Sequence, residues 1–249
     1  MLHSLRCEHM SKRLTFGAPF YVAVIFLFCI FSNVQAQNIH SVQVEFTRSV
    51  KSDNEVEITE GTIYFKVPQK ITVKISTPLN QWMQIEGTQT LIYYPDREVA
   101  FALESETTVV LPFFLGFLNA TLEDFGLTKV GYHFVDSKLL GDTLIARWEP
   151  PEEVKEFLGT TYTGFARDRL VFVENTNPEG SSGSRAEYSN HFKYRGMYFP
   201  LEIKVTNLSE EGSFVENIVF KNPQFNEDLP PEAFNLNIPV DIEIRKGVW

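Results

Sequence analysis

Cysteine is the residue type that this chain most nearly lacks. Its 249 residues include two cysteines, Cys7 and Cys29, and both fall before residue 37, in a stretch with the features of an export signal. From residue 37 onward the sequence contains no thiol, which excludes a disulfide framework, a cysteine nucleophile and a cysteine-ligated metal there. A domain of this composition has to be stabilised by its hydrophobic core alone.

Histidines and the common catalytic motifs are scarce as well. After residue 36 the only histidines are His40, His133 and His191, and no His or acidic residue stands at metal-ligand spacing around them. The sequence has no glycine-rich phosphate loop, no G-x-S-x-G and no H-E-x-x-H. We therefore predict a protein that is not an enzyme and that holds no cofactor or metal. A hydrolase built on two carboxylates stays an open alternative, because sequence does not show which acids meet in space.

The sequence also lacks an apolar run long enough to cross a membrane. The longest run, Phe20 to Phe31, has 12 residues, whereas a spanning helix needs about 20. Lys12 and Arg13 precede this run, and Val34-Gln35-Ala36 follows it as a small-residue cleavage site. This order is typical of a secretory signal peptide rather than of a membrane anchor.

The export signal divides the chain into two parts. We predict a cleaved signal peptide over residues 1–36, read from Met1 or Met10, and a single domain over residues 37–249. The 213 residues that remain when 36 are removed from 249 suit one domain with a sizeable core. We expect this exported domain to be soluble and monomeric once the leader is removed.

Basic residues are in the minority. The chain has 22 Lys and Arg against 32 Asp and Glu; without the leader's three basic residues and one acid these become 19 and 31, a net charge of −12. Such an acidic protein is a poor partner for nucleic acid or anionic lipid headgroups. Aromatic residues, by contrast, are abundant, with 22 Phe, 9 Tyr and 3 Trp. A sheet with a few helices hides so many rings with difficulty, which favours an apolar pocket.

Alternation of apolar and polar residues dominates the pattern that is present. Between Gly61 and Asp96 it forms four short runs broken by proline and glycine, as expected for an antiparallel meander with one apolar face. Further strands are predicted over 41–50, 99–103, 132–135, 143–148, 168–174, 186–194, 198–206 and 213–221, and residues 238–242 close the chain.

One stretch has helical spacing instead. Leu115, Leu118, Leu122 and Phe125 recur at helical intervals, and the stretch begins at Pro112 and ends before a glycine. Because its first half is apolar almost all round, residues 112–125 form either a core helix that seals the sheet or a lid that a ligand displaces. With short helical turns at 150–158 and 229–234, the sequence predicts an α+β fold: a strongly curved antiparallel sheet, or incomplete β-barrel, with a helical lid.

The stretch from 61 to 96 resembles the periplasmic lipoprotein carriers of the LolA family. Their strand motif, a glycine, alternating apolar residues and a proline, is matched by Gly61, Ile63, Phe65 and Pro68, with Ile71 and Val73 following in place. Their second motif is matched by Ile85, Glu86, Gly87, Leu91, Tyr94 and Pro95, and their C-terminal pattern by Phe199, Pro200, Asn222, Phe234 and Pro239. The resemblance extends over residues 41–243.

The resemblance implies an incomplete barrel whose apolar cavity, covered by helices, shields the acyl chains of lipoproteins or a related lipid and delivers them toward the outer membrane. It also implies an inner-membrane release complex and an outer-membrane receptor as partners. The side chains that we expect to line the cavity and its cover are Ile63, Phe65, Val67, Ile71, Val73, Met83, Ile85, Leu91, Tyr93, Phe101, Leu103, Phe114, Phe117 and Leu118.

Two departures from the family pattern leave room for another cargo or another role. Val67 stands where the family often has a basic residue, and the first strand begins too close to Gln37 for the usual N-terminal helix. The alternative is a module of the same fold that binds a protein or senses envelope stress without transferring lipid.

Overall fold

The computed structural model describes residues 39–52, 55–68, 70–209 and 212–248. Residues 39–249 form one compact unit. The predicted signal peptide over 1–36 lies outside the described residues. Within the described ranges, no helix combines the length and the apolar character needed to cross a membrane.

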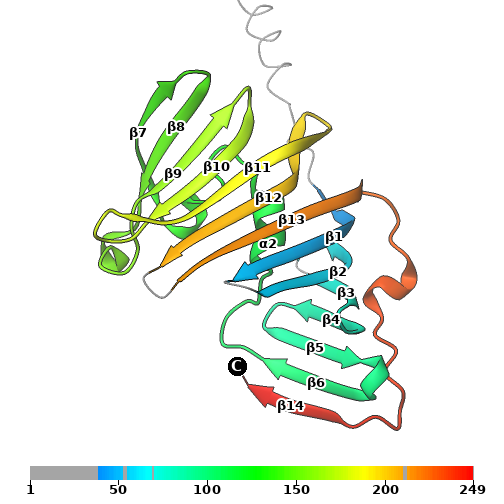
Figure 1. Cartoon of the computed structure of the whole chain (residues 1–249). Helices are drawn as coiled ribbons and strands as arrows, with labels where there is room; N and C mark the ends of the chain where they lie inside the picture. Colours follow the sequence, from blue (N-terminus) through cyan, green and yellow to red (C-terminus); the bar gives the residue numbers. More distant parts are fainter. Residues whose placement is uncertain (1–38, 53–54, 69, 210–211, 249) are drawn as a thin grey trace, which may run out of the picture. The chain divides into compact units, whose positions relative to one another are not determined.

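The described residues build one 14-stranded sheet from two meanders (Figure 1). In each meander, consecutive strands pair antiparallel. The first consists of β1 (Ser41–Ser52), β2 (Glu55–Lys66), β3 (Lys70–Thr77), β4 (Gln81–Glu86), β5 (Gln89–Tyr94) and β6 (Val99–Glu104). The second consists of β7 (His133–Leu140), β8 (Thr143–Glu149), β9 (Thr161–Ala166), β10 (Arg169–Thr176), β11 (Ser182–Tyr194), β12 (Met197–Ser209) and β13 (Gly212–Phe225).

The two meanders join through β1 and β13, which pair antiparallel in the middle of the sheet. A last strand, β14 (Ile244–Val248), pairs parallel with β6 at one edge, and β7 forms the other edge. The sheet is strongly curved but does not close (Figure 1). The predicted curved, incomplete barrel is therefore confirmed in its sheet, and the predicted helical cover takes a different form.

The connection between the meanders crosses one face of the sheet and carries the α-helix α2 (Pro112–Asn119). We call the sheet face against which α2 packs the inner face and the opposite one the outer face. Four short 3-10 helices complete the described elements: η1 (Pro95–Arg97), η2 (Thr128–Val130), η3 (Glu152–Val154) and η4 (Pro231–Phe234). The last two lie within the predicted helical turns at 150–158 and 229–234.

The helix ends at Asn119, six residues before the predicted end, because side chains beyond it bond to nearby backbone groups. The Thr121 hydroxyl donates to the Leu118 carbonyl oxygen at 2.8 Å, and the Asp124 carboxylate accepts from the Gly126 N–H at 2.8 Å. Such local bonds compete with helical ones. Phe125 then adopts a left-handed conformation, with φ of 54°, which an α-helix does not accommodate.

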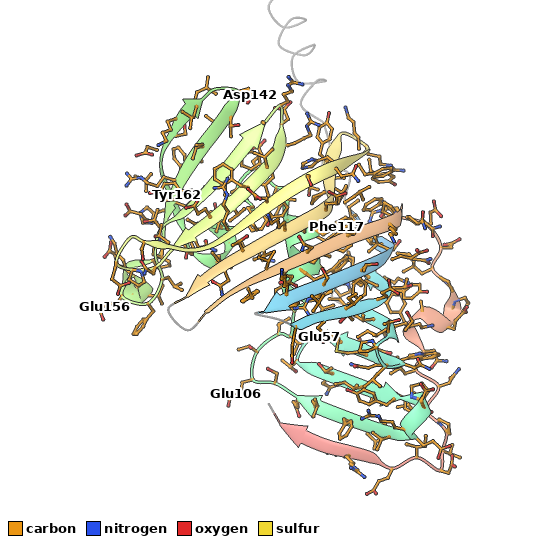
Figure 2. The ribbon with its side chains drawn as sticks, in the orientation of Figure 1. Glu57, Glu106, Phe117, Asp142, Glu156 and Tyr162 are labelled. Atoms are coloured by element: carbon orange, nitrogen blue, oxygen red, sulfur yellow. The ribbon has the colours of Figure 1, made fainter. Side chains whose placement is uncertain are left out.

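The core lies where α2 meets the seam between β1 and β13. Phe117 is wholly buried, and its ring centroid is 4.6 Å from that of Phe220 and 5.3 Å from that of Phe199. Figure 2 shows Phe117 among the central strands, whereas the labelled Asp142 and Glu156 lie at the periphery. A smaller cluster around Trp148 and Leu127 lies under the chain that follows the helix. Of the two open interpretations of this stretch, the geometry favours the core helix.

Two strands escaped prediction. Strand β9 has threonines at its inner-face positions; Thr163 is fully buried and accepts a hydrogen bond from the Trp148 indole N–H at 3.0 Å. The buried positions of β9 are therefore not apolar, and the sequence shows no alternation of apolar and polar residues there. Strand β14 follows residues 238–242, the segment expected to close the chain, and pairs with β6, which is far away in sequence.

Candidate functional site

The inner face of the first meander carries most of the predicted cavity residues. The register pairs Ile63 with Val73, Val73 with Met83, and Phe65 with Ile71. Residues that pair directly in an antiparallel sheet project from the same face. The same rows extend through Thr90 and Ile92 of β5. The predicted residues on this shared inner face are Ile63, Phe65, Ile71, Val73, Met83, Ile85, Phe101 and Leu103.

Leu91 and Tyr93 project from the outer face, so their assignment to the shared cavity face is corrected. They pair with Gln84 and Trp82, not with Ile85 and Met83. The physical reason is the length of the β4–β5 loop. Its two residues, 87 and 88, shift the alternation by one position, so that odd-numbered residues of β5 face outward. The four-residue loop to β6 shifts it back, which returns Phe101 and Leu103 to the inner face.

Val67 also lies outside the cluster. It follows the end of β2 in the tight connection to β3, and half of its side chain is exposed. Its N–H donates to the His40 carbonyl oxygen at 2.9 Å, so the backbone there serves the strand connection. The structure thus separates Val67 from the inner-face residues.

The helical members of the predicted set differ in burial. Phe114 and Phe117 are core side chains with no more than 1% exposure, whereas Leu118 is partly exposed. Leu118 lines a small apolar cavity of about 230 Å³ with Phe65 and Ile71. This volume is below the roughly 300–1,000 Å³ typical of small-molecule sites. The predicted residues alone therefore enclose little free space.

Larger cavities flank α2 on the side of the second meander. One of about 400 Å³ lies beside the first turn of α2, over β11, β12 and β13. Another of about 590 Å³ lies beneath residues 120–123, and Phe165 and Leu144 are among its lining. Sequence reasoning missed both, because their walls come from strands that alternate unremarkably and meet only in the folded sheet.

Apolar side chains of the inner face continue past α2 in both directions and stay partly exposed. On the first meander these are Met83, Ile92, Phe101 and Leu103; on the second, Phe165, Ala186 and Val205. An ordinary core would cover them, since each buried CH₂ contributes about 0.8 kcal/mol. The inner face therefore presents more apolar surface than the single helix covers.

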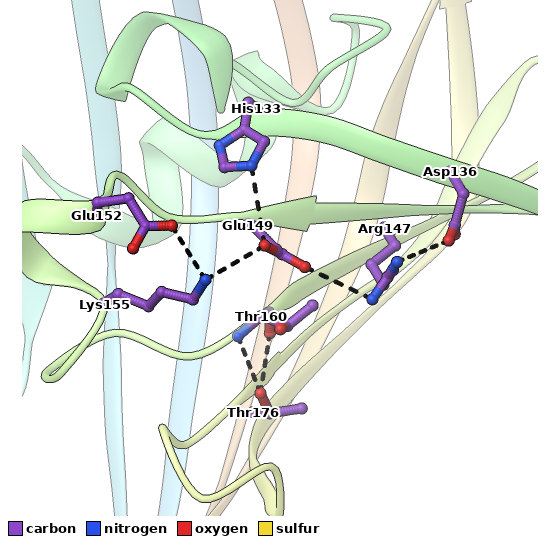
Figure 3. A network of polar contacts seen from close by, with 8 residues as sticks. All are labelled: His133, Asp136, Arg147, Glu149, Glu152, Lys155, Thr160 and Thr176. Atoms are coloured by element: carbon purple, nitrogen blue, oxygen red, sulfur yellow. Dashed lines mark hydrogen bonds and ion pairs between the residues drawn. The ribbon is translucent and has the colours of Figure 1, made fainter.

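At the edge of the second meander, charged side chains form a network of ion pairs (Figure 3). Arg147 pairs with Asp136 at 2.8 Å and with Glu149 at 3.6 Å, and Lys155 bridges Glu149 and Glu152. Bonding to Asp136 raises the pKa of Arg147, and bonding to Glu152 raises that of Lys155. These are solvent-exposed ion pairs, a class that contributes little to stability.

Thr160 and Thr176, also drawn in Figure 3, connect the neighbouring loop to β10: the Thr176 hydroxyl accepts from the Thr160 N–H at 3.0 Å and donates to the Thr160 carbonyl oxygen at 3.2 Å. Among the residues that the structure describes, no group of three or more His, Cys, Asp or Glu is placed to hold a metal ion.

No family model matches the chain, and no curated protein matches its sequence. Solved structures match it in fold. A LolA superfamily protein from Nitrosomonas europaea is 14% identical with a TM-score of 0.53, over 80% of this chain and 91% of that one. A DUF1329 family protein from Desulfovibrio piger is 12% identical with a TM-score of 0.57, over 81% and 92%.

A third structure points the same way. It is an outer membrane lipoprotein-sorting protein domain from Vibrio parahaemolyticus. It is 11% identical with a TM-score of 0.54, over 80% of this chain and 91% of that one. At these identities the likeness concerns the fold alone. The fold is LolA-like, as the sequence resemblance implied.

Proposed function

We propose that this protein is a periplasmic carrier that shields the acyl chains of lipoproteins or a related lipid and delivers them toward the outer membrane. The observation that supports this function best is the partly exposed apolar surface of the inner face on both flanks of α2. A carrier needs such a surface, because acyl chains bind through about 0.8 kcal/mol per buried CH₂. The LolA-like fold adds to this support.

The structure changes the form that a cover would take. Because Phe114 and Phe117 belong to the core, we expect α2 to stay packed on the sheet. Displacing it would expose the centre of the sheet. In our proposal the cargo lies in the grooves beside α2, while the less buried Leu115 and Leu118 border the chain. The acidic charge of the protein keeps it from adhering to anionic membranes between its two partners.

Native mass spectrometry of the protein, purified from its own envelope without detergent, tests the carrier function. We expect an added mass that matches a lipid or lipoprotein and disappears after mild organic extraction. A bare mass, together with no uptake of a fluorescent fatty-acid probe, would contradict the proposal.

A second candidate function is supported by the edge strand β7. Every residue of β7 is exposed, including Phe134 at 54%, Leu139 at 71% and Leu140 at 66%. Exposed apolar edge strands are templates for pairing with another chain. A bare mass in the experiment above, with a protein that co-purifies only when β7 is intact, would favour a protein-binding module.

A further inference from the structure

The cavity of about 400 Å³ beside the first turn of α2 is lined by a tyrosine whose hydroxyl makes no hydrogen bond to a described residue. The floor of this cavity, which we call the Tyr188 groove, is formed by Ile203, Val205 and Ile218 of β12 and β13. Phe113 and Gly116 of α2 form one wall. None of these residues belongs to the set predicted from the sequence, so the groove is a separate part of the inner face.

Tyr188 of β11 lies in this groove with 6% of its surface exposed. Its ring packs edge-on against Phe125, with 5.9 Å between centroids. Its hydroxyl lies under the helix, where a Cβ added to Gly116 would be 3.7 Å from the oxygen. No hydrogen bond joins this hydroxyl to any residue that the structure describes, and its oxygen is not sealed from solvent, so a ligand can reach it from the groove. Burial raises the pKa of the Tyr188 hydroxyl, which therefore stays a donor.

The only charged side chains that line the groove among the described residues are Arg48 and Glu216, and they neutralise each other. The Arg48 Nε is 2.5 Å from the Glu216 Oε1. The glutamate is the more buried partner, with 15% of its side chain exposed against 33% for the arginine. Because each charge is already paired, the groove offers neither a ligand carboxylate nor a ligand ammonium a free countercharge to replace the water that it would lose. The groove is therefore suited to an uncharged ligand.

The Tyr188 hydroxyl is a donor in a mostly apolar groove, and the carbonyl oxygen of a ligand can accept its hydrogen bond in place of water. The apolar floor of the groove favours a ligand with a hydrocarbon chain, and the neutral ion pair favours a ligand whose polar end is uncharged. We propose that the Tyr188 groove binds the ester or amide carbonyl of an acylated amphiphile, with the Tyr188 hydroxyl donating to the carbonyl oxygen. The chain then lies along Ile203, Val205 and Ile218. This inference rests on the proposed carrier function and names the chemistry of one subsite.

Titration with methyl decanoate, an uncharged ester, tests the subsite by NMR of methyl-labelled protein. We expect the methyl signals of Ile203 and Ile218 to shift, and decanoate at neutral pH to bind at least about tenfold more weakly than the ester. The Tyr188→Phe variant removes the hydroxyl and keeps the ring, and should bind the ester about tenfold more weakly. Tyr93→Phe, the same change on the outer face, is the matched control and should bind as the unaltered protein does.

Equal affinity of Tyr188→Phe and the unaltered protein for the ester, equal binding of ester and carboxylate, or unmoved signals at Ile203 and Ile218 would each overturn the subsite. Two further titrations, with a monoacylglycerol and with a diacylglyceryl-cysteine peptide, show whether the carbonyl comes from a glyceride or a lipoprotein. Loss of affinity for either ligand in Tyr188→Phe supports the subsite.

The two proposals can fail separately. A co-purified cargo with no dependence on Tyr188 leaves the carrier standing and removes the subsite. If ester binding depends on Tyr188 but the protein carries no cargo from its envelope, the subsite stands and the carrier function is removed.

Discussion

Gly61 occupies a position where β2 and β3 approach more closely than a side chain permits. A Cβ there would overlap the Lys74 carbonyl oxygen and lie 3.0 Å from the Ile75 Cα. The β2–β3 register shifts between Glu60 and Gly61, so the close approach coincides with an irregularity of the pairing. The glycine that opens the family-like strand motif therefore has a steric role on the inner face.

We expect Gly61→Ala to lower the free energy of unfolding by about 1–3 kcal/mol, because the added methyl group has to push two backbones apart. Chemical denaturation measures this change. Gly116→Ala is the control: its Cβ meets only ordinary contacts and alanine favours helix, so stability should stay the same or rise. Equal effects of the two variants would contradict the steric account.

His191 is a half-buried titratable side chain whose ring nitrogen lies 2.8 Å from the Leu170 carbonyl oxygen. Burial, assisted by the charge of Arg169, lowers its pKa below the ordinary 6.5, although the hydrogen bond acts in the opposite direction. Above pH 6.5 the histidine is neutral in both states. As the pH falls toward the lowered pKa, the unfolded chain takes up a proton first, so this group makes the fold less stable.

Replacement of His191 by glutamine should therefore flatten the fall in stability just below pH 6.5. Urea denaturation at pH values on either side of 6.5 measures the difference in slope. His133→Gln removes a histidine from the exposed strand β7 and is the comparison. A His191→Gln protein with the slope of the unaltered chain would show that another group governs this pH range.

At the scale of elements, α2 holds the two meanders together through its phenylalanines. Phe117 contacts rings from β12 and β13, and Phe114 contacts Phe65 of β2 at 5.9 Å between centroids. The stacked pair of Phe114 and Phe117, 5.9 Å apart, connects the two sets of contacts. A helix of eight residues would be unstable alone, so its existence depends on this packing.

Phe117→Ala should lower the free energy of unfolding by about 3–5 kcal/mol, the usual loss for a buried phenylalanine. Thermal unfolding followed by circular dichroism measures it. Leu115→Ala changes a helix residue that is 40% exposed and should cost much less. If Phe117→Ala folds with unchanged stability, α2 is a movable lid after all.

Strand β5 offers a direct test of which face binds the cargo. Ile92 and Leu91 are adjacent, both are partly buried, and they project from opposite faces of the sheet. We expect Ile92→Asp to abolish uptake of a fluorescent fatty-acid probe, because it places a charge on the inner face. Leu91→Asp, on the outer face, should preserve uptake. Loss of uptake in Leu91→Asp alone would place the cargo on the outer face.

The alternation of apolar residues was sufficient to predict most strands, because most of them have one covered face; β7 is exposed on both. The face from which a side chain projects was predictable only where the connecting loops kept odd-numbered residues on the same face, as from Phe65 through Ile71 to Ile85. The prediction was wrong for Leu91 and Tyr93. The two-residue β4–β5 loop was a usable signal that the parity would change. The Tyr188 groove had no such signal, because Arg48, Tyr188 and Glu216 are far apart in the chain and meet through strand pairing.

At the scale of the whole described unit, the sheet is covered by the helix at its centre and is more exposed at both edges. The central strands β1, β12 and β13 are covered by α2, whereas β7 is exposed along its length and β14 lies at the opposite edge. Backbone hydrogen bonds that are shielded by packing open less often than those near solvent. Stability should therefore decline from the centre toward both edges.

Hydrogen–deuterium exchange followed by mass spectrometry should show this gradient. We expect the slowest exchange in β1 and β13, and the fastest strand exchange in β7 and β14. The same peptides of the denatured protein give the reference for unprotected amides. Uniform protection across all strands would contradict a sheet that is stabilised mainly at its centre.

The antiparallel pairing of β1 with β13 has a consequence for how fast the fold forms. Every other antiparallel pair joins neighbours in the chain and closes a short loop, so each meander can assemble by local steps. Among the described strands, β1 with β13 and β14 with β6 are the pairs that must form across a long stretch of chain, at a much larger cost in loop-closure entropy. Folding of this protein should therefore wait on these distant pairings, and until β1 meets β13 each meander exposes the strand that the other will cover.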